Sequence, residues 1–320
     1  MRALVTGATG FIGSHLVEGL IREGFETTCL VRETSSLSYL EGLKVTLVRG
    51  DCADRSSVFR AVGGFDYVFH VAGVTKAQSD KEFFDANVTG TRNVADAVLE
   101  RNRNINRFFY LSSLAAAGPS SDGVPIHEGI DARPVSVYGS TKHEGEKIAL
   151  SIRGEIPVTV IRPPAVYGPR DRDLLVFFKM VKAGIVPYWG RSFYSFIYVD
   201  DLVSAMVLSV LKPEGEGQIF FVSDGTVYST DQVIDALAGA LGRRPLRLRI
   251  PKWVLPLLAR ASRAAGGAAI INSDKVREIQ YDYWTCDSGK ANSLLAFTPK
   301  VRMTEGARWT ADWYRTHHWL

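Results

Sequence analysis

The first half of the chain alternates short β-branched apolar runs with longer segments whose apolar residues recur at helical spacing. The apolar runs occupy residues 3–6, 26–31, 45–50, 66–71, 107–113 and 158–161. The longer segments cover residues 11–23, 80–101 and 138–152. Strands that alternate with helices in this way pair in parallel. The pattern therefore predicts an α/β fold, a Rossmann-like doubly wound parallel sheet.

The second half of the chain follows a different pattern, with Pro- and Gly-rich loops beyond Arg162. A helix is expected at residues 199–211, a strand near residues 218–222, and further helix from residue 229. The run LRLRI at residues 246–250 alternates apolar side chains with Arg, which predicts a half-exposed strand. This half is expected to form a smaller unit of mixed structure.

The length of 320 residues exceeds the size at which one hydrophobic core keeps growing, so two packed regions are expected. Residues 1–165 are predicted to form a dinucleotide-binding domain, joined by about residues 196–226. A smaller mixed α/β substrate-binding domain would then comprise residues 166–195 and 227–320.

Composition narrows the class of protein. An apolar share of 46% and a charged share of 22% are typical of soluble globular chains. The net charge of +4 suits an anionic cofactor, but the chain lacks the clustered Lys and Arg of nucleic-acid binders. Its three cysteines lie far apart and never form a CxxC pair, which predicts neither disulfides nor a zinc site. We expect a cytoplasmic protein that acts on a small molecule, without nucleic acid or metal.

No segment is predicted to cross a membrane. The most apolar one, Trp253–Ile271, is interrupted by Pro256, Arg260 and Arg263. A helix lying on a membrane surface is the alternative for this segment. The N-terminus enters a strand directly, without the long apolar core of a secretory signal.

The sequence TGATGFIG places Gly7, Gly10 and Gly13 between the first predicted strand and the first helix. Glycines permit a tight turn and a close approach of pyrophosphate to the backbone, and the helix N-terminus offers unpaired N–H groups. The spacing departs from GxGxxG, so a plain turn is the alternative. Its position in a βαβ unit favours dinucleotide binding.

The end of the second strand distinguishes the two nicotinamide cofactors. An acidic residue there binds the ribose hydroxyls of NAD, whereas an Arg accommodates the 2′-phosphate of NADP. Arg32 occupies this region, so NADP(H) is the favoured cofactor. If Arg32 is instead only a solvated surface residue, NAD(H) is the alternative cofactor. Asp51, after the third strand, is expected either to meet the adenine or to cap the next helix.

The sequence YGSTK places Tyr138 and Lys142 four residues apart, on one face of a predicted helix. A free phenol titrates near pH 10, about three units above neutral, which corresponds to about 4 kcal/mol. One ammonium about 4 Å away supplies about that much at an effective dielectric constant of 20. Lys142 is therefore predicted to lower the pKa of Tyr138 and make it an acid/base. An ordinary surface helix with the same five residues is the alternative.

Six motifs in order resemble the extended short-chain dehydrogenase/reductase family, also described as NAD-dependent epimerases/dehydratases. They are TGATGFIG at residues 6–13, GD at 50–51, HVAG at 70–73, NVTGT at 87–91, YGSTK at 138–142 and RPPAVYGP at 162–169. The match runs along almost the whole chain, and six ordered motifs are far more specific than any one of them.

The resemblance implies roles for particular residues. The cofactor-binding residues would be Gly7, Thr9, Gly10, Phe11, Ile12, Arg32, Asp51, Cys52, Val71, Ala72, Gly73, Asn87, Leu111, Tyr138, Lys142, Pro163, Ala165 and Val166. Tyr138 would transfer the proton, and Lys142 would also contact the nicotinamide ribose. A serine at the fifth strand's exit would hold the substrate oxygen; Ser113 precedes Gly118 by the family's interval, and Ser112 is the alternative.

The expected substrate class follows from two positions at which this chain departs from the nucleotide-sugar enzymes of the family. Relatives that act on nucleotide sugars usually carry Asn in an RPxNVYG stretch and Arg before a Phe-Ile segment; this chain has Ala165 and Tyr194-Ser195. A diphosphate would then lack a contact of roughly 1.5 to 3 kcal/mol, unless another arginine replaced it. The stretch RPPAVYGPRD and the apolar Trp253–Leu258 segment resemble the branch of 3β-hydroxysteroid dehydrogenases and dihydroflavonol reductases.

That branch implies an NAD(P)-dependent oxidoreductase that interconverts a secondary alcohol and a ketone on a bulky, largely apolar molecule. Thr75, Lys76 and Gln78 would face the substrate with Ser113, or form only a solvated loop. The alternatives are a nucleotide-sugar epimerase or dehydratase, and a non-catalytic NADP-binding sensor. Packing of the two long helices, residues 80–101 and 138–152, would make a homodimer.

Overall fold

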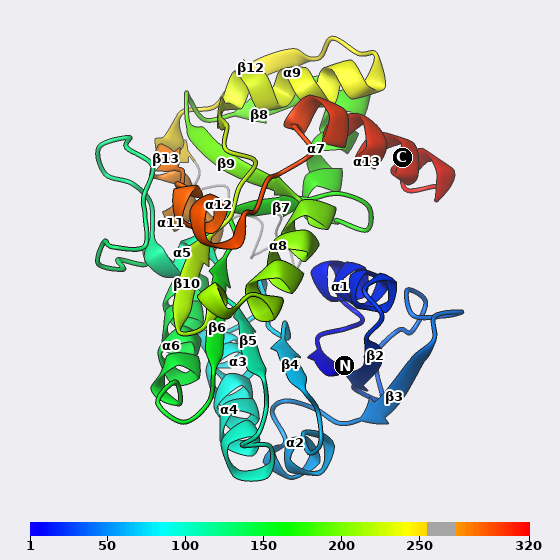
Figure 1. The fold of residues 1–320 in the computed structure, drawn as a ribbon. Coiled ribbons are helices and arrows are strands. Elements are labelled where there is room, and N and C mark those ends of the chain that lie inside the picture. The colour runs from blue at the N-terminus through cyan, green and yellow to red at the C-terminus, as the bar shows by residue number, and fades with distance from the viewer. Residues whose placement is uncertain (255–272) are drawn as a thin grey trace.

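The computed structural model describes residues 1–254 and 273–320. Figure 1 shows a large sheet covered by helices on both faces, with a smaller assembly of strands and helices at one end. Most of the apolar Trp253–Ile271 segment, including the part of Trp253–Leu258 beyond Val254, lies outside the described residues. Among the residues that are described, the helices are all too short or too polar to cross a bilayer.

Seven parallel strands form the large sheet, in the order β10-β6-β5-β4-β1-β2-β3. Their bounds are β1 Arg2–Thr6, β2 Glu26–Val31, β3 Val45–Arg49, β4 Tyr67–His70, β5 Arg107–Leu111, β6 Val158–Arg162 and β10 Gln218–Phe221. The strand order changes direction at β1, where the neighbours are β2 and β4. This arrangement confirms the predicted Rossmann-like sheet, and such a change of direction opens a crevice at the carboxyl ends of the strands.

Two apolar layers hold helices against the sheet. One contains α1 and α8, with Leu16 and Met206 packed near Phe109. The other contains α2, α4 and α6, with Val98 and Ile148 beside Phe108. The helices are α1 Phe11–Arg22, α2 Arg55–Ala61, α4 Gly90–Arg101, α5 Leu114–Ala117, α6 Val137–Ser151 and α8 Val199–Leu211. Successive strand residues point to opposite faces, so Phe108 and Phe109 serve different layers.

The remaining elements form two small sheets with their own core. Strand β9 pairs with β11, β13 and β7, and β12 pairs with β8. The strands are β7 Ala165–Tyr167, β8 Ile185–Tyr188, β9 Phe193–Tyr198, β11 Val227–Ser229, β12 Leu246–Arg249 and β13 Tyr283–Trp284. The helices beside them are α7 Asp173–Ala183, α9 Thr230–Leu241, η3 Lys252–Val254, α11 Ser273–Ile279 and α13 Met303–Thr316. Phe178, Leu237 and Tyr314 lie in their shared apolar cluster. The short helices η2 Pro213–Gly215 and α12 Gly289–Leu295 instead lie against α8 and the large-sheet strand β10.

Two elements differ from the sequence-based expectation. The segment 80–101 is not one regular helix, because α3 (Asp80–Phe84) passes through a π-helical turn, η1 (Asp85–Thr89), before α4 begins. Such turns often occur at functional sites. Residues of β12 form a strand as predicted, but all four are exposed, so Leu246 and Leu248 do not face a core.

A buried ion pair joins α6 to the sheet. Arg162, at the end of β6, donates from Nε and Nη2 to the Glu146 carboxylate at 2.9 and 2.5 Å. The side chains are 5% and 2% exposed, respectively, so neither charge has water to replace its partner. Ser112 also donates to Glu146, at 2.8 Å.

Glu146→Ala should lower the free energy of unfolding by about 3 to 5 kcal/mol, because Arg162 would be left as an uncompensated buried charge. Urea unfolding at pH 7 would measure the change. Glu144→Ala, on the exposed side of the same helix, is the matched control and should cost at most about 1 kcal/mol. Equal losses of unfolding free energy in the two variants would show that the buried ion pair contributes little to stability.

Candidate active site

The turn after β1 brings the backbone very close to the exit of β4. Gly7 has φ +74°, and a Cβ there would lie 2.7 Å from the Ala72 nitrogen. A Cβ on Gly13 would lie 2.0 Å from the Gly7 oxygen. Gly10 caps α1 without a side chain, so no side chain occupies the helix N-terminus where Thr9, Phe11 and Ile12 also lie. A pyrophosphate fits this cradle, because glycine permits its approach and the helix end favours negative charge.

A buried histidine connects this turn to the π-helical segment. The Nδ1 atom of His70 lies 2.7 Å from Thr6 Oγ1, and its Nε2 lies 3.0 Å from Thr91 Oγ1. Ala72 donates its N–H to Thr6 Oγ1, and Thr91 donates to the Asn87 carbonyl. Burial, and next the charge of Lys142, lower the pKa of His70 to about 3. The ring is therefore neutral and serves as a structural link.

Asn87, in the π-helical turn, fixes the loop that follows β4. Its Oδ1 accepts the Val74 N–H at 2.9 Å, and its Nδ2 donates to the Val74 carbonyl and to Thr141 Oγ1, both at 3.1 Å. A Cβ on Gly73 would lie 2.9 Å from Asn87 Oδ1. Asn87 thus holds the loop of Val71, Ala72 and Gly73 against α6.

Tyr138 and Ser113 meet at the carboxyl edge of the sheet. Ser113 caps α5, directly after β5, and its hydroxyl lies close enough to the Tyr138 phenol, in the first turn of α6, to lower the pKa of that phenol. Ser112 is committed elsewhere, because it is buried and donates to Glu146. The structure therefore brings Ser113, and not Ser112, to the phenol.

Lys142 turns toward β5. Its Nζ donates to the Leu111 carbonyl at 2.6 Å and lies 4.4 Å from the centre of the Tyr110 ring. A Cβ on Gly73 would lie 3.6 Å from the same Nζ, so the ammonium also borders the loop after β4. Burial lowers the pKa of Lys142 to about 7, opposed by the nearby Glu146 carboxylate.

The expected effect of Lys142 on the phenol is not found. Removal from water raises the pKa of Tyr138 to about 12; the Ser113 hydroxyl opposes this rise, and the charges of Glu278 and Asp173 add to it. The Lys142 ammonium is directed at the Leu111 carbonyl, and burial lowers its own pKa. Tyr138 is thus a protonated phenol at neutral pH.

The residues expected near the adenosine lie at the ends of β2 and β3. Arg32 is exposed, and no carboxylate among residues 1–254 and 273–320 pairs with its guanidinium. Asp51 accepts the Ala53 N–H at 2.9 Å. The alternative that Asp51 caps the next helix is wrong, because Asp54 caps α2. Cys52 is partly buried, and burial raises its pKa to about 12, so it is no reactive thiol.

Thr75, Lys76 and Gln78 lie on an exposed loop, where Lys76 forms an ion pair with Asp173 at the start of α7. Asp173 and Glu278, which act on the phenol, were not anticipated. Neither stands in a motif, so their proximity to Tyr138 depends on the tertiary fold. Near β6, the Pro163 carbonyl accepts the Leu114 N–H at 2.8 Å, and Ala165 and Val166 continue into β7.

Three arginines near the site, Arg170, Arg172 and Arg191, have partners other than a diphosphate. Arg170 forms an ion pair with Glu18 of α1 and lies over the Tyr39 ring. Arg172 lies over Trp319, and Arg191 over Phe193. In the part of the chain that the structure describes, no group of three His, Cys, Asp or Glu side chains is placed to hold a metal ion.

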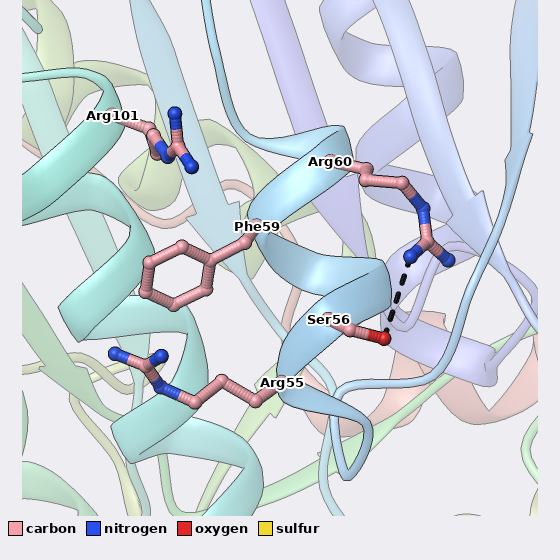
Figure 2. A pocket seen from close by; sticks show the side chains of 5 residues that line it. All are labelled: Arg55, Ser56, Phe59, Arg60 and Arg101. Carbon is pink, nitrogen blue, oxygen red and sulfur yellow. Dashed lines mark hydrogen bonds between the residues drawn. The ribbon is translucent and has the colours of Figure 1, made fainter.

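A shallow cavity of about 440 Å³ lies elsewhere, between α2 and α4 (Figure 2). Its lining residues are Arg55, Ser56, Phe59, Arg60 and Arg101, and Arg55 lies over the Phe59 ring at 4.1 Å. Arg55 also pairs with Glu100. None of the residues predicted to bind cofactor or substrate lines this cavity.

The fold and the glycine cradle define a dinucleotide-binding α/β enzyme. The family model for the NAD dependent epimerase/dehydratase family matches residues 3–223, and the chain belongs to this family. It is thus an NAD(P)-dependent enzyme of the extended short-chain dehydrogenase/reductase type, as the motifs predicted.

Comparisons with known proteins agree with this assignment. Ceramide reductase of Caulobacter vibrioides is 29% identical over 325 residues, covering 99% of this chain and 95% of its own. Sterol demethylase protein B of Methylococcus capsulatus is 30% identical over 278 residues, covering 81% and 80%. The crystal structure of gox2253 has a TM-score of 0.84 and 25% identity, covering 100% of this chain and 99% of that one.

Lys142→Met should make stability less dependent on pH above 7. The pKa of Lys142 is about 7 in the folded protein and near its ordinary 10.5 in the unfolded chain. Between these values the unfolded chain binds more protons, so wild-type stability gains from rising pH, by at most about 1.4 kcal/mol per unit. The wild-type value minus the Lys142→Met value should increase from pH 7 to pH 9 in urea unfolding. A constant difference would contradict the lowered pKa.

Proposed function

We propose that this enzyme interconverts a secondary alcohol and a ketone on a bulky, largely apolar small molecule, with Tyr138 as the proton-transferring group. The observation that carries the proposal is that Ser113, Tyr138 and Lys142 lie together at the carboxyl edge of the sheet, next to the glycine cradle. A nicotinamide cofactor, when bound, supplies or accepts the hydride. The glycine turn would hold its pyrophosphate, and Arg32 and Asp51 its adenosine half.

The protein groups perform the remaining steps. Ser113 donates a hydrogen bond to the carbonyl oxygen and orients it toward the phenol. Tyr138 gives its proton to that oxygen as negative charge develops, which stabilises the alkoxide. A phenol whose pKa is raised to about 12 holds this proton at neutral pH and still gives it to a more basic alkoxide. This ionisation state supports the direction of ketone reduction.

Two features support an apolar substrate. Ala165 stands exposed where nucleotide-sugar relatives usually carry Asn, and Arg170 is held by Glu18 on α1. The names of two relatives, ceramide reductase and sterol demethylase protein B, refer to bulky apolar molecules. A nucleotide-sugar epimerase or dehydratase is the second candidate, which the family description favours. The non-catalytic sensor has less support, because Ser113, Tyr138 and Lys142 are all retained.

Turnover distinguishes the candidates. The purified protein should consume NADPH with apolar ketones and show no isomerisation of UDP-glucose or UDP-galactose. Absorbance of the reduced nicotinamide and chromatography of the sugars are the two measurements. Isomerisation without net NADPH consumption would replace the proposal with the epimerase, and cofactor binding without either reaction would leave the sensor.

Tyr138→Phe should reduce kcat at least about 100-fold, which corresponds to the lower range of general acid catalysis. Its Kd for NADPH, measured by fluorescence, should change little. Ser113→Ala should lower kcat, with a loss of stability of about 1 kcal/mol from the missing α5 cap. Ser112→Ala should chiefly lower stability, because it removes one of the two hydrogen bonds that Glu146 Oε2 accepts. A larger fall in kcat for Ser112→Ala would reverse the assignment of the two serines.

We propose that NADP(H) is preferred, because exposed Arg32 has no carboxylate partner among the described residues and can meet a 2′-phosphate. Arg32→Ala should raise the Kd for NADPH roughly 10- to 100-fold, since it removes a charge-assisted contact of roughly 1.5 to 3 kcal/mol. The Kd for NADH should remain within about twofold, because that cofactor lacks the phosphate. Equal changes for the two cofactors would contradict this role.

A further inference from the structure

The start of α6 is capped by a residue from the other end of the chain. Asp274, on α11, accepts the Val137 N–H at 2.7 Å through Oδ1 and the Tyr138 N–H at 2.9 Å through Oδ2. The carboxylate is nearly buried, with 9% of the residue exposed. One of its two partners is the backbone of the residue that carries the phenol.

The same helix makes a second contact with this turn. Glu278 lies four residues after Asp274, on the same face of α11. Its Oε1 accepts the hydroxyl proton of Ser136 at 2.9 Å, and Ser136 Oγ in turn accepts the Gly139 N–H at 3.0 Å. Two carboxylates thus hold the N-terminus of α6, where the helix dipole favours negative charge.

These contacts complete the hydrogen bonding of the first turn. A helix leaves its first N–H groups without internal partners. Ser136 satisfies Gly139 locally, and Asp274 satisfies Val137 and Tyr138. Because Ser136 remains as a local cap, loss of Asp274 should leave α6 formed and alter only how its first turn is held.

The contacts of α11 show which part of the molecule Asp274 links to the phenol. Val276 and Ile279 pack against Trp189, and the Glu278 carbonyl accepts the Trp284 indole N–H at 3.0 Å. These partners lie in or beside the small sheets rather than the large one. The position of α11 is therefore transmitted to the start of α6 through two carboxylates, of which Asp274 alone bonds the backbone of Tyr138.

We propose that Asp274 is a positioning residue, which fixes the first turn of α6 so that the Tyr138 phenol stays against Ser113. The inference rests on the proposed function, since it concerns the same phenol. Asp274 touches neither reacting atoms nor cofactor in this account, and it acts only through the backbone of Val137 and Tyr138.

Asp274→Asn tests the proposal, because it keeps the shape but removes the charge and one of the two acceptors. We expect kcat for ketone reduction to fall roughly 10- to 100-fold, as displacement of a reacting group does. The Kd for NADPH should change less than about twofold, because no cofactor contact is removed. Asp287→Asn is the matched control, because Asp287 likewise accepts a helix-start N–H, that of Gly289, at α12. It should leave both quantities unchanged.

A second readout does not need turnover. In protein labelled with ¹³C at the tyrosine ring, the Tyr138 signal is assigned by its loss in Tyr138→Phe. Asp274→Asn should shift or broaden that signal, and Asp287→Asn should not. An unmoved signal, or an unchanged kcat in an active enzyme, would overturn the positioning role. If the wild type reduces no ketone, the proposed function fails, and the signal alone still decides whether Asp274 positions the phenol.

Discussion

The close seating of α6 on the large sheet is the constraint on which the site depends. A Cβ on Gly145 would lie 2.4 Å from the Tyr110 hydroxyl and 2.5 Å from the Asn87 carbonyl, so only glycine permits this approach. The buried pair of Glu146 and Arg162 then fixes the helix along the strand direction. Lys142 and Tyr138, one and two turns earlier, are thereby held at the exits of β4 and β5.

The electrostatics of the site follow from burial rather than from accumulated charge. Lys142 is shifted toward its neutral form, Tyr138 retains its proton, and His70 is neutral. Each shift has the same cause, the removal of the group from water, which disfavours the charged form. The buried ion pair in this region joins Glu146 to Arg162, which donates two hydrogen bonds to the carboxylate.

The small sheets and their helices complete the surroundings of the phenol. Asp173 on α7 and Glu278 on α11 lie close enough to raise the pKa of Tyr138, and Lys76 reaches Asp173 from the loop after β4. The large sheet therefore provides the glycine cradle and the phenol, while the smaller unit sets the charge around it. The division agrees with the general rule that ligands bind at the carboxyl ends of parallel strands, where loops and added segments cover them.

Local patterns in the sequence determined the strand and helix order, the glycine turn and the spacing of Tyr138 and Lys142, because each depends on neighbours a few residues apart. They also identified the family, whose motifs stand in order along the chain. Only the tertiary structure distinguished the role of Ser113 from that of Ser112, since Ser112 donates a hydrogen bond to Glu146, 34 residues away. Likewise it turned Lys142 toward Leu111 and brought Asp274 to the start of α6. These choices rest on contacts between distant segments and on burial, which periodicity along a single chain does not encode.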